Sequence, residues 1–181
     1  MRHMQDGATD IEHMVLVSSR QDKSSSTPHA SSSSHHQMQL LEASEADSLV
    51  NPILIVDDCP FNQLALSACL EQFGLKADLC SDGLLALQRV KARIEKNQTM
   101  FQLILMDFSM PECDGPTSTT LIREFVSTNT RAEQPFICFV TAYSEKSFKG
   151  LAKQAGSNHF LVKPIFKTQL HKVLIKAGML S

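Results

Sequence analysis

The sequence lacks the features that mark several large classes of protein. Its formal net charge of -2 and isoelectric point near 6.4 leave no basic excess that could hold a nucleic acid by counterion release. No apolar run approaches the roughly 20 residues that a membrane-spanning helix needs. The first thirty residues are too polar to form the core of a signal peptide. We therefore expect a cytoplasmic protein with no nucleic-acid partner and no membrane segment in this chain.

Paired cysteine spacing is missing as well. The five cysteines follow no C-x-x-C pattern, are odd in number and mostly fall within apolar segments. We expect reduced core residues in a cytosol-like compartment rather than disulfides. The five are Cys59, Cys69, Cys80, Cys113 and Cys138.

The first 50 residues differ in composition from the rest of the chain. They contain two serine tracts, a pair of histidines and little apolar periodicity. Such a segment buries too little apolar surface to offset the entropy lost on ordering. We expect residues 1–50 to be a disordered serine-rich tail or linker, in which 38–43 could form one helical turn. Residues 51–181 are expected to form one domain.

From residue 52 onward, short apolar runs alternate with amphipathic stretches. Runs that are apolar on both faces are typical of central strands in a parallel sheet, and apolar residues at i, i+3, i+4 and i+7 are typical of helices. The order predicts five strands and five helices in strict alternation, a doubly wound α/β fold with a parallel sheet. The strand runs are 53–56, 76–80, 103–106, 136–140 and 160–162, and the clearest helical stripes begin at Leu66, Phe148 and Leu170.

Polar residues stand where these strands are expected to end. Asp57 and Asp58 follow the first run, and Asp107 follows the third. Thr141 and Lys163 follow the fourth and the fifth. Parallel strands bring their carboxyl ends to one edge of the sheet, where ligands of open α/β folds bind. Three carboxylates at one edge would repel one another unless a cation held them, and ligands that are all oxygen point to Mg²⁺.

Asp107 is the best candidate for a nucleophile at this edge. A metal held by carboxylates, with an ammonium and a hydroxyl opposite, can bind a phosphoryl group while a carboxylate attacks in line. Asp107 ends a central strand, and the loop after it contains Pro111 and Gly115, which restrict the turn. The sequence therefore predicts that Asp107 accepts a phosphoryl group.

Four motifs at these strand ends resemble those of the receiver domain of two-component response regulators and hybrid histidine kinases. Each motif alone is weakly specific, but four in this order are highly specific, and the resemblance covers residues 52–180. It implies a flavodoxin-like fold with strand order 2-1-3-4-5 that takes part in a phosphorelay. The motifs are Ile55–Asp58, Leu105–Pro111 with Asp114–Gly115, Val140–Ala142 and Val162–Ile165.

The resemblance assigns roles around a bound Mg²⁺. Asp57, Asp58 and Asp107 would supply carboxylate ligands, and the backbone carbonyl of Ser109 would complete the protein ligands. Lys163 would bind a phosphoryl oxygen. The domain would be a phosphoacceptor that assists its own phosphorylation and dephosphorylation, rather than an enzyme.

The resemblance also implies a switch. Thr141 would bind a second phosphoryl oxygen, and Phe160 would turn inward as Thr141 moves toward the phosphate. Ser109 and Tyr143 stand where the family tunes the lifetime of its acyl phosphate. The Lys163–Pro164 peptide is often cis in this family.

The partners that the resemblance implies are proteins. The phosphoryl group would come from a histidine kinase or a histidine phosphotransfer protein. A downstream target would bind the face built from the helix at 148–155, the strand at 160–162 and the helix at 170–177. One helix follows Lys163, so we expect a single-domain regulator or the carboxyl-terminal receiver of a hybrid histidine kinase. Membrane attachment would then come only through the parent kinase.

Other interpretations remain open. Taken alone, Asp57 and Asp58 could cap a helix that begins near Pro60, and Phe160 could be an ordinary core residue. An aspartyl-phosphate phosphatase of the haloacid-dehalogenase type is one alternative, although such enzymes carry an aspartate where Ser109 stands. The others are a phosphate-independent interaction domain, which would not need the complete acidic site, and a flavin binder, which would need a glycine- or hydroxyl-rich loop after the first strand.

Overall fold

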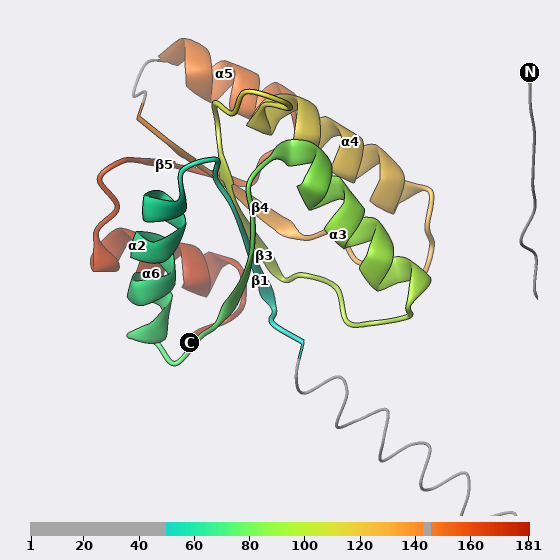
Figure 1. Ribbon diagram of the computed structural model, residues 1–181, viewed down its shortest axis with the longest axis horizontal. Coiled ribbons are helices and arrows are strands. Elements are labelled where there is room, and N and C mark those ends of the chain that lie inside the picture. Colours follow the sequence, from blue (N-terminus) through green and yellow to red (C-terminus); the bar gives the residue numbers. More distant parts are fainter. Residues whose placement is uncertain (1–49, 143–145) are drawn as a thin grey trace, which may run out of the picture.

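The computed structural model describes residues 50–142 and 146–181. Within them, five strands and five helices alternate from a first strand to a last helix, as the apolar pattern predicted (Figure 1). The strands are β1 (Ile53–Val56), β2 (Ala77–Cys80), β3 (Leu103–Asp107), β4 (Phe136–Thr141) and β5 (His159–Val162). The helices are α2 (Pro60–Glu71), α3 (Gly83–Glu95), α4 (Gly115–Ser127), α5 (Lys146–Gln154) and α6 (Lys167–Lys176).

Two expectations fall on segments that are not described. The serine-rich segment, with its possible helical turn at 38–43, lies outside the described residues, as does Tyr143. The proposed division of the chain at residue 50 therefore stays a prediction.

The sheet confirms the expected topology. Its strands are parallel and stand in the order β2-β1-β3-β4-β5. The chain leaves β1 toward β2 on one side and later returns to place β3 on the other, so the strand order reverses beside β1. In open parallel sheets this switch point opens a crevice beyond the carboxyl ends of the strands. The ends of β1 and β3 are therefore the place to look for a site.

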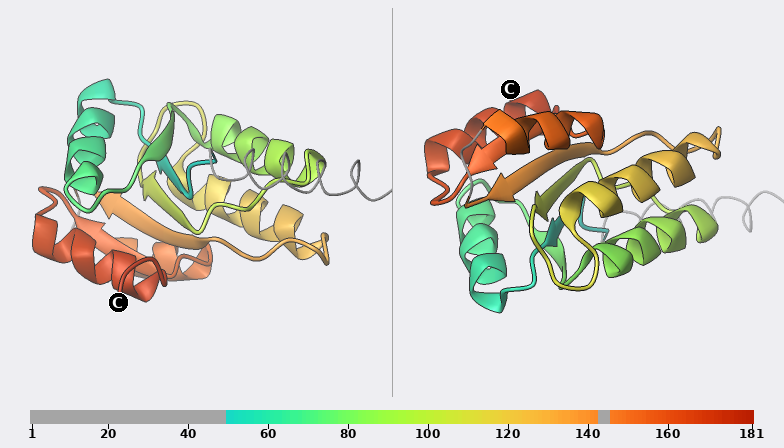
Figure 2. Two further views of the ribbon diagram at one scale, coloured as in Figure 1. Left: turned by 90° about the horizontal axis from the view of Figure 1, so that it is seen from below. Right: turned by 90° about the horizontal axis from the view of Figure 1, so that it is seen from above.

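The helices cover both faces of the sheet and make a three-layer sandwich (Figure 2). Helices α3, α4 and α5 pack on one face, and α2 and α6 pack on the other. Successive side chains of β1 point to opposite faces of the sheet. Leu54 and Val56 pack on the side of α3, α4 and α5, and Ile53 and Ile55 pack on the side of α2 and α6. Burial on both faces explains why the central strands are continuous apolar runs.

Short capping contacts set where two of the helices begin. Asp82 precedes α3, and its carboxylate accepts hydrogen bonds from the backbone N–H groups of Leu84 and Leu85 at 2.7 and 2.9 Å. Asp114 precedes α4 and accepts from the backbone N–H of Thr117 at 2.8 Å. Both side chains satisfy N–H groups that have no partner within the helix. The loops that lead into the two helices are therefore held in one conformation.

A buried arginine holds the entry of the chain into the fold. The guanidinium of Arg93 donates to the Asp78 carboxylate at 2.9 Å and to the backbone carbonyl of Asn51 at 2.6 Å. It also lies over the ring of Phe101, with its central carbon 3.4 Å from the ring centroid. The Asn51 amide donates to the other Asp78 oxygen at 2.8 Å. This cluster ties the residues just before β1 to β2 and α3.

The cysteines are all free, as expected from their spacing, and Cys80, Cys113 and Cys138 are buried. In the described parts of the chain, every helix is too short or too polar to cross a bilayer.

Candidate functional site

The carboxyl ends of the strands bring the predicted residues together at one edge of the sheet. Asp57 follows β1, Asp107 is the last residue of β3 and Thr141 is the last residue of β4. All three are buried, whereas the neighbouring Asp58 is exposed. Lys163 follows β5 directly, and its peptide bond to Pro164 is cis.

Lys163 joins the two buried carboxylates. Its Nζ lies 2.8 Å from Oδ2 of Asp57 and 2.6 Å from Oδ1 of Asp107. These residues are 106 and 56 positions away from Lys163 in the chain. The contact therefore exists because the parallel strands β1, β3 and β5 bring their carboxyl ends to one edge of the sheet. One ammonium against two carboxylates leaves one negative charge uncompensated inside a largely buried cluster. A further cation is thus favoured electrostatically at this place.

The environment shifts the pKa values of the central pair. Burial raises the pKa of the Asp107 carboxyl above its ordinary value, and the hydrogen bond from Lys163 offsets this only in part. Partial burial by itself lowers the pKa of Lys163, but its hydrogen bonds to Asp107 and Asp57 outweigh that effect and leave the pKa raised. Lys163 therefore stays protonated across the physiological range. Ionisable groups that have shifted pKa values and face one another at the carboxyl edge of a sheet are typical of functional sites.

The remaining Asp107 oxygen is also held. Its Oδ2 accepts a hydrogen bond from the backbone N–H of Ser109 at 3.0 Å. Ser109 itself is exposed, two residues beyond the end of β3. Gly115 packs directly against the backbone carbonyl of Asp107, and its N–H donates to the carbonyl of Phe108 at 3.1 Å. The loop thus folds back over the acceptor residue at a point where a side chain would collide with it.

Asp57 is oriented by the first turn of α2. Its Oδ1 accepts from the backbone N–H of Cys59 and from the side-chain amide of Asn62, both at 2.9 Å. The Gln63 amide donates to two backbone carbonyls, those of Asp57 at 2.7 Å and Cys80 at 2.9 Å. Asp57 does not cap α2, because the N-cap residue is Cys59 and no side chain caps the first turn. Its carboxylate instead holds the residue that precedes the helix and at the same time accepts from Lys163.

The sequence analysis missed Asn62 and Gln63. A sequence signal for them exists, because a helix that begins at Pro60 places both residues in its first turn, beside the strand end that it follows. What the pattern could not show is which of the two reaches the carboxylate and which reaches the backbone. That difference depends on the direction of each side chain in the folded molecule.

The oxygen ligands at this edge are of the type that Mg²⁺ prefers, although they are not already arranged around one metal position. In residues 50–142 and 146–181, no three side chains of histidine, cysteine, aspartate or glutamate converge closely enough to form a metal site by themselves. Asp57 and Asp107 nevertheless present carboxylate oxygens beside an uncompensated charge, with Asp58 next in the chain. Mg²⁺ prefers this chemistry, because it binds through one or two carboxylates and keeps several of its waters.

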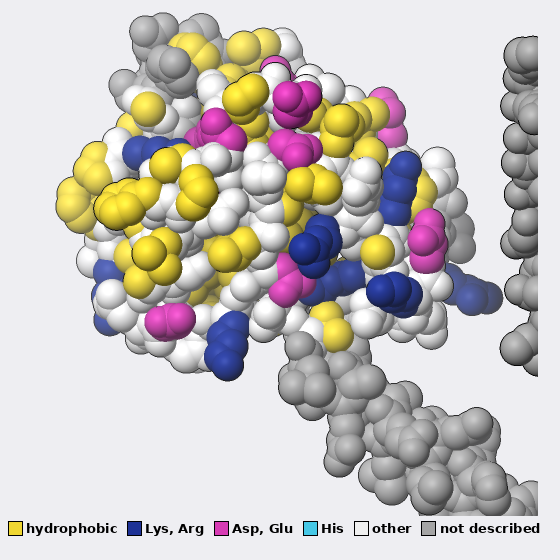
Figure 3. All heavy atoms as spheres, viewed as in Figure 1, with side chains coloured by type: hydrophobic (Ala, Val, Ile, Leu, Met, Phe, Trp, Pro, Cys, Tyr) yellow, Lys and Arg dark blue, Asp and Glu magenta, His cyan; other side chains and the backbone are white. Residues whose placement is uncertain are grey.

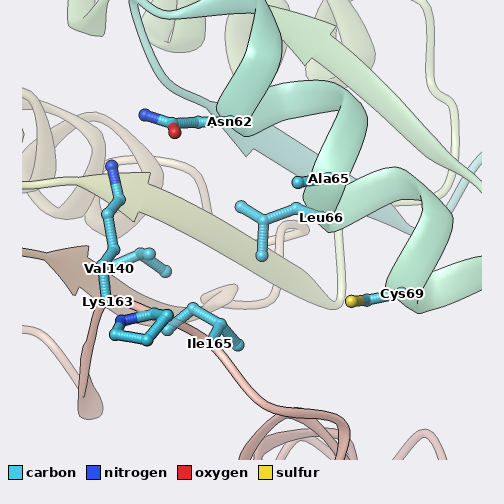
Figure 4. A pocket seen from close by; sticks show the side chains of 8 residues that line it. Asn62, Ala65, Leu66, Cys69, Val140, Lys163 and Ile165 are labelled. Atoms are coloured by element: carbon cyan, nitrogen blue, oxygen red, sulfur yellow. The ribbon is translucent and has the colours of Figure 1, made fainter.

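A pocket of about 490 Å³ opens beside the site, between α2 and the segment after β5 (Figure 4). Asn62 and Lys163 lie at one end of it and Cys69 lies at the other. The walls between them are apolar. The remaining residues of the lining are Ala65, Leu66, Val140, Pro164 and Ile165.

Exposed apolar side chains stand on the two segments that form this pocket, α2 and the segment after β5. Phe61 and Leu64 on α2 are 76% and 65% exposed, and Phe166 before α6 is 61% exposed. Figure 3 shows apolar side chains gathered over α2 and the segment between β5 and α6. Exposed apolar groups that cluster next to a site mark a surface for protein contact.

Phe160 stands on β5, away from these groups. It is half-buried and packs against the hydrophobic cluster under α3, α4 and α5. The Nζ of Lys149 on α5 lies 5.9 Å from the centroid of its ring. The structure thus places Phe160 between β5 and α5, on the face proposed for a downstream target.

Comparison with protein families identifies the family to which this fold belongs. The chain matches the family model described as the response regulator receiver domain over residues 53–175. This chain belongs to that family. The receiver domain takes part in phosphorelay signalling, which confirms the expectation drawn from the four motifs.

The relatives of this receiver domain include sensor kinases. The histidine-protein kinase BarA of Escherichia coli (strain K12) is 32% identical over 142 residues, which is 78% of this chain and 14% of BarA. The sensor histidine kinase GacS of Pseudomonas protegens is 33% identical over 124 residues, which is 68% of this chain and 13% of GacS. The chain thus corresponds to a small part of each of these relatives.

A solved receiver domain is similar in structure and was crystallised with metal. The receiver domain of the sensor histidine kinase PA1611 from Pseudomonas aeruginosa PAO1 is 29% identical, with a TM-score of 0.58. The match covers 70% of this chain and 96% of that one, and that structure has a magnesium ion coordinated in its active site cleft. A chain of the CheX–CheY complex from Borrelia burgdorferi, at 23% identity and a TM-score of 0.60 over 70% of this chain and 87% of that one, shares the fold.

Proposed function

We propose that this receiver domain accepts a phosphoryl group from a partner phosphohistidine onto the carboxylate of Asp107. The observation that carries the proposal is the bridge from Lys163 to Asp57 and Asp107 at 2.8 and 2.6 Å. It places a positively charged ammonium beside a buried carboxylate at the carboxyl edge of the sheet. A transferred phosphoryl group would meet a nucleophile and a counter-charge at the same position.

The transfer exchanges one phosphorus bond for another. A carboxylate oxygen of Asp107 forms a bond to phosphorus, while the bond from phosphorus to the histidine nitrogen breaks and the imidazole leaves with its electron pair. Lys163 and the hydroxyl of Thr141 would contact the phosphoryl oxygens. The domain would assist its own phosphorylation and dephosphorylation in this way, because the groups that stabilise the transferring charge belong to this chain.

Asp57, Asp58, Asp107 and the backbone carbonyl of Ser109 would hold Mg²⁺. When bound, the ion supplies a positive charge that stabilises the phosphoryl oxygens during transfer. The solved relative with magnesium in its active site cleft supports this assignment. So does the uncompensated charge of the cluster that Lys163 forms with Asp57 and Asp107.

The partner proteins would use two different surfaces. The donor of the phosphoryl group, a histidine kinase or a histidine phosphotransfer protein, would dock on the exposed apolar side chains beside the pocket. The downstream target would bind the face made by α5, β5 and α6, where Phe160 lies under α5. Separate surfaces would allow a target to sense the phosphorylated domain after the donor has left.

The experiment that tests the proposal uses the full chain, Mg²⁺ and a small phosphodonor such as phosphoramidate, with intact mass as the measurement. We expect the wild type to gain one phosphoryl group only when Mg²⁺ is present, and Asp107→Asn to gain none. Asp114→Asn is the matched control, because Asp114 lies in the same loop and asparagine also caps helices. Phosphorylation of the Asp107→Asn variant to the wild-type extent would refute the assignment.

A further inference from the structure

We propose that Asn62 is a positioning residue that turns the Asp57 carboxylate toward the phosphoacceptor site. The inference rests on the proposed function, since it concerns how the chain prepares its acidic edge for Mg²⁺. It starts from the two oxygens of Asp57, which have different partners. Oδ1 faces the first turn of α2, and Oδ2 faces Lys163 and the acceptor beyond it.

The α2 side of the Asp57 carboxylate is held by neutral donors. The backbone N–H of Cys59 and the amide of Asn62 both donate to Oδ1, so this oxygen has two hydrogen bonds. A carboxylate can only accept, so the nitrogen of the Asn62 amide must be the atom that faces it. Two donors on one oxygen fix the rotation of the group and leave Oδ2 directed at the site.

Burial makes this orientation matter. Asp57 is 1% exposed, so solvent cannot replace a hydrogen bond lost by rotation of the carboxylate. The bond from Cys59 comes from the backbone and is set by the path of the chain. The bond from Asn62 comes from a side chain and can be removed by substitution. Groups that hold a metal-ligating carboxylate from behind tune metal affinity in this way.

The neighbouring residue offers a natural contrast. Gln63 stands in the same turn and also holds α2 to the sheet, but it donates to the backbone carbonyls of Asp57 and Cys80 and not to the carboxylate. Removing either amide should loosen the docking of α2. Removal of the Asn62 amide alone should free the Asp57 carboxylate to rotate.

Asn62 is also open to the pocket beside the site. It lines the pocket together with Lys163, so both side-chain partners of the Asp57 carboxylate lie at the same end of it (Figure 4). A group that entered the pocket would contact the residues that orient Asp57. The pocket and the acidic edge are therefore connected through Asn62.

The test compares Mg²⁺ binding and stability in four full-length proteins: wild type, Asn62→Leu, Gln63→Leu and Asp58→Ala. Leucine keeps much of the volume of both amides and removes their donors. Calorimetry measures the dissociation constant of Mg²⁺, and melting in EDTA measures stability without metal. We expect both leucine variants to melt lower than wild type in EDTA. We expect about tenfold weaker Mg²⁺ binding in Asn62→Leu and little change in Gln63→Leu.

The outcomes separate this proposal from the proposed function. Failure of the wild type to bind Mg²⁺ would refute the metal site itself. An unchanged Mg²⁺ affinity in Asp58→Ala would refute it as well. If Asn62→Leu binds Mg²⁺ with the affinity of the wild type, only the role of Asn62 is refuted. Equal weakening in Asn62→Leu and Gln63→Leu would show a general effect of α2 docking and would also overturn it. If Asn62→Leu does not fold, Asn62→Ala replaces it, and failure of both would show that Asn62 serves the fold instead.

Discussion

Two glycines show how single residues shape the surroundings of the site. Gly115 lies against the carbonyl of Asp107, and Gly83, the first residue of α3, lies against the loop that precedes α4. A Cβ on Gly83 would stand 2.6 Å from the Cβ of Ser118 and 2.7 Å from the carbonyl oxygen of Cys113. The hydroxyl of Ser118 donates to the Gly83 carbonyl at 2.9 Å, so the contact is both close and buried. Space, rather than backbone conformation, requires glycine at these positions.

Gly83→Ala should therefore destabilise the domain by about 1–3 kcal/mol, because the added methyl group forces α3 away from the loop. Gly150→Ala is the matched control. Gly150 lies inside α5 with open space around it, so alanine there should stabilise the helix by about 0.5–1 kcal/mol. Urea denaturation of both variants gives the two free energies. Equal effects of the two substitutions would contradict the packing argument.

Strand β4 and helix α5 are the elements through which the site could reach a target. Thr141 ends β4 at the site and is buried, and Phe160 on the neighbouring β5 packs under α5. A phosphoryl group on Asp107 adds acceptor oxygens near Thr141. Movement of its hydroxyl toward them would leave space that the ring of Phe160 could fill. The ring carries no hydroxyl and loses no hydrogen bond when it turns, so the inward state could already be populated before phosphorylation.

Thr141→Ala should still permit phosphorylation while reducing the response of this face, since Asp107 and Lys163 remain. The measurement is hydrogen exchange of the backbone amides across residues 146–162, with and without a beryllofluoride mimic of the phosphoryl group. Thr141→Ser keeps the hydroxyl and should respond like wild type. A full wild-type response in Thr141→Ala would show that Thr141 does not couple the site to this face. Phe160 would then be an ordinary core residue.

At the scale of the whole molecule, each face of the sheet carries a helix with an exposed leucine, and the pocket beside the site lies along α2. Leu64 on α2 is 65% exposed, and Leu84 on α3 is 48% exposed. Helices α2 and α3 pack on opposite faces of the sheet. A donor protein that docks beside the pocket should therefore depend on one leucine and not on the other.

Leu64→Asp should slow phosphoryl transfer from a phosphorylated histidine phosphotransfer protein by about tenfold or more, since a charge in an apolar contact costs at least 1.4 kcal/mol. Transfer from a small phosphodonor should be unchanged, because the site is intact. Leu84→Asp should leave both rates near those of wild type. A rate of protein-dependent transfer that is insensitive to Leu64→Asp would place the donor elsewhere.

The boundary of the folded domain is a second property of the whole molecule. Among the described residues, both hydrophobic clusters are built from residues 53–180. Removal of residues 1–49 should leave the free energy of unfolding unchanged, because the composition of this serine-rich segment gives it little apolar surface to bury. Removal of residues 1–52 should lower it by about 1–3 kcal/mol, because it deletes the Asn51 groups that contact Arg93 and Asp78 and the Pro52 carbonyl that accepts from Gln102. Thermal melting of the two truncated chains gives the comparison, and equal melting would contradict a boundary at residue 51.

The sequence by itself determined the order of elements, the parallel sheet and the residues at its edge. Short apolar runs that alternate with amphipathic stretches are typical of central parallel strands between helices, and the carboxyl ends of such strands meet at one edge. The positions of Asp57, Asp107, Thr141 and Lys163 followed from that rule. Tertiary structure decided what these groups do to one another. The sequence predicted Mg²⁺ between the carboxylates and Lys163 against the phosphoryl oxygens, whereas in the structure Lys163 itself bridges Asp57 and Asp107, and Asp58 is exposed.

Tertiary structure also decided how the acidic edge is supported. Asn62 orients the Asp57 carboxylate and Gly115 admits the Asp107 carbonyl, and their positions in the sequence do not specify these contacts. Their roles depend on side-chain direction and on the distance between segments that are remote in the chain. Periodicity reports which side of an element is buried, and it contains no information about which atom lies 3 Å from which other. Those contacts arise when the helices pack on the sheet.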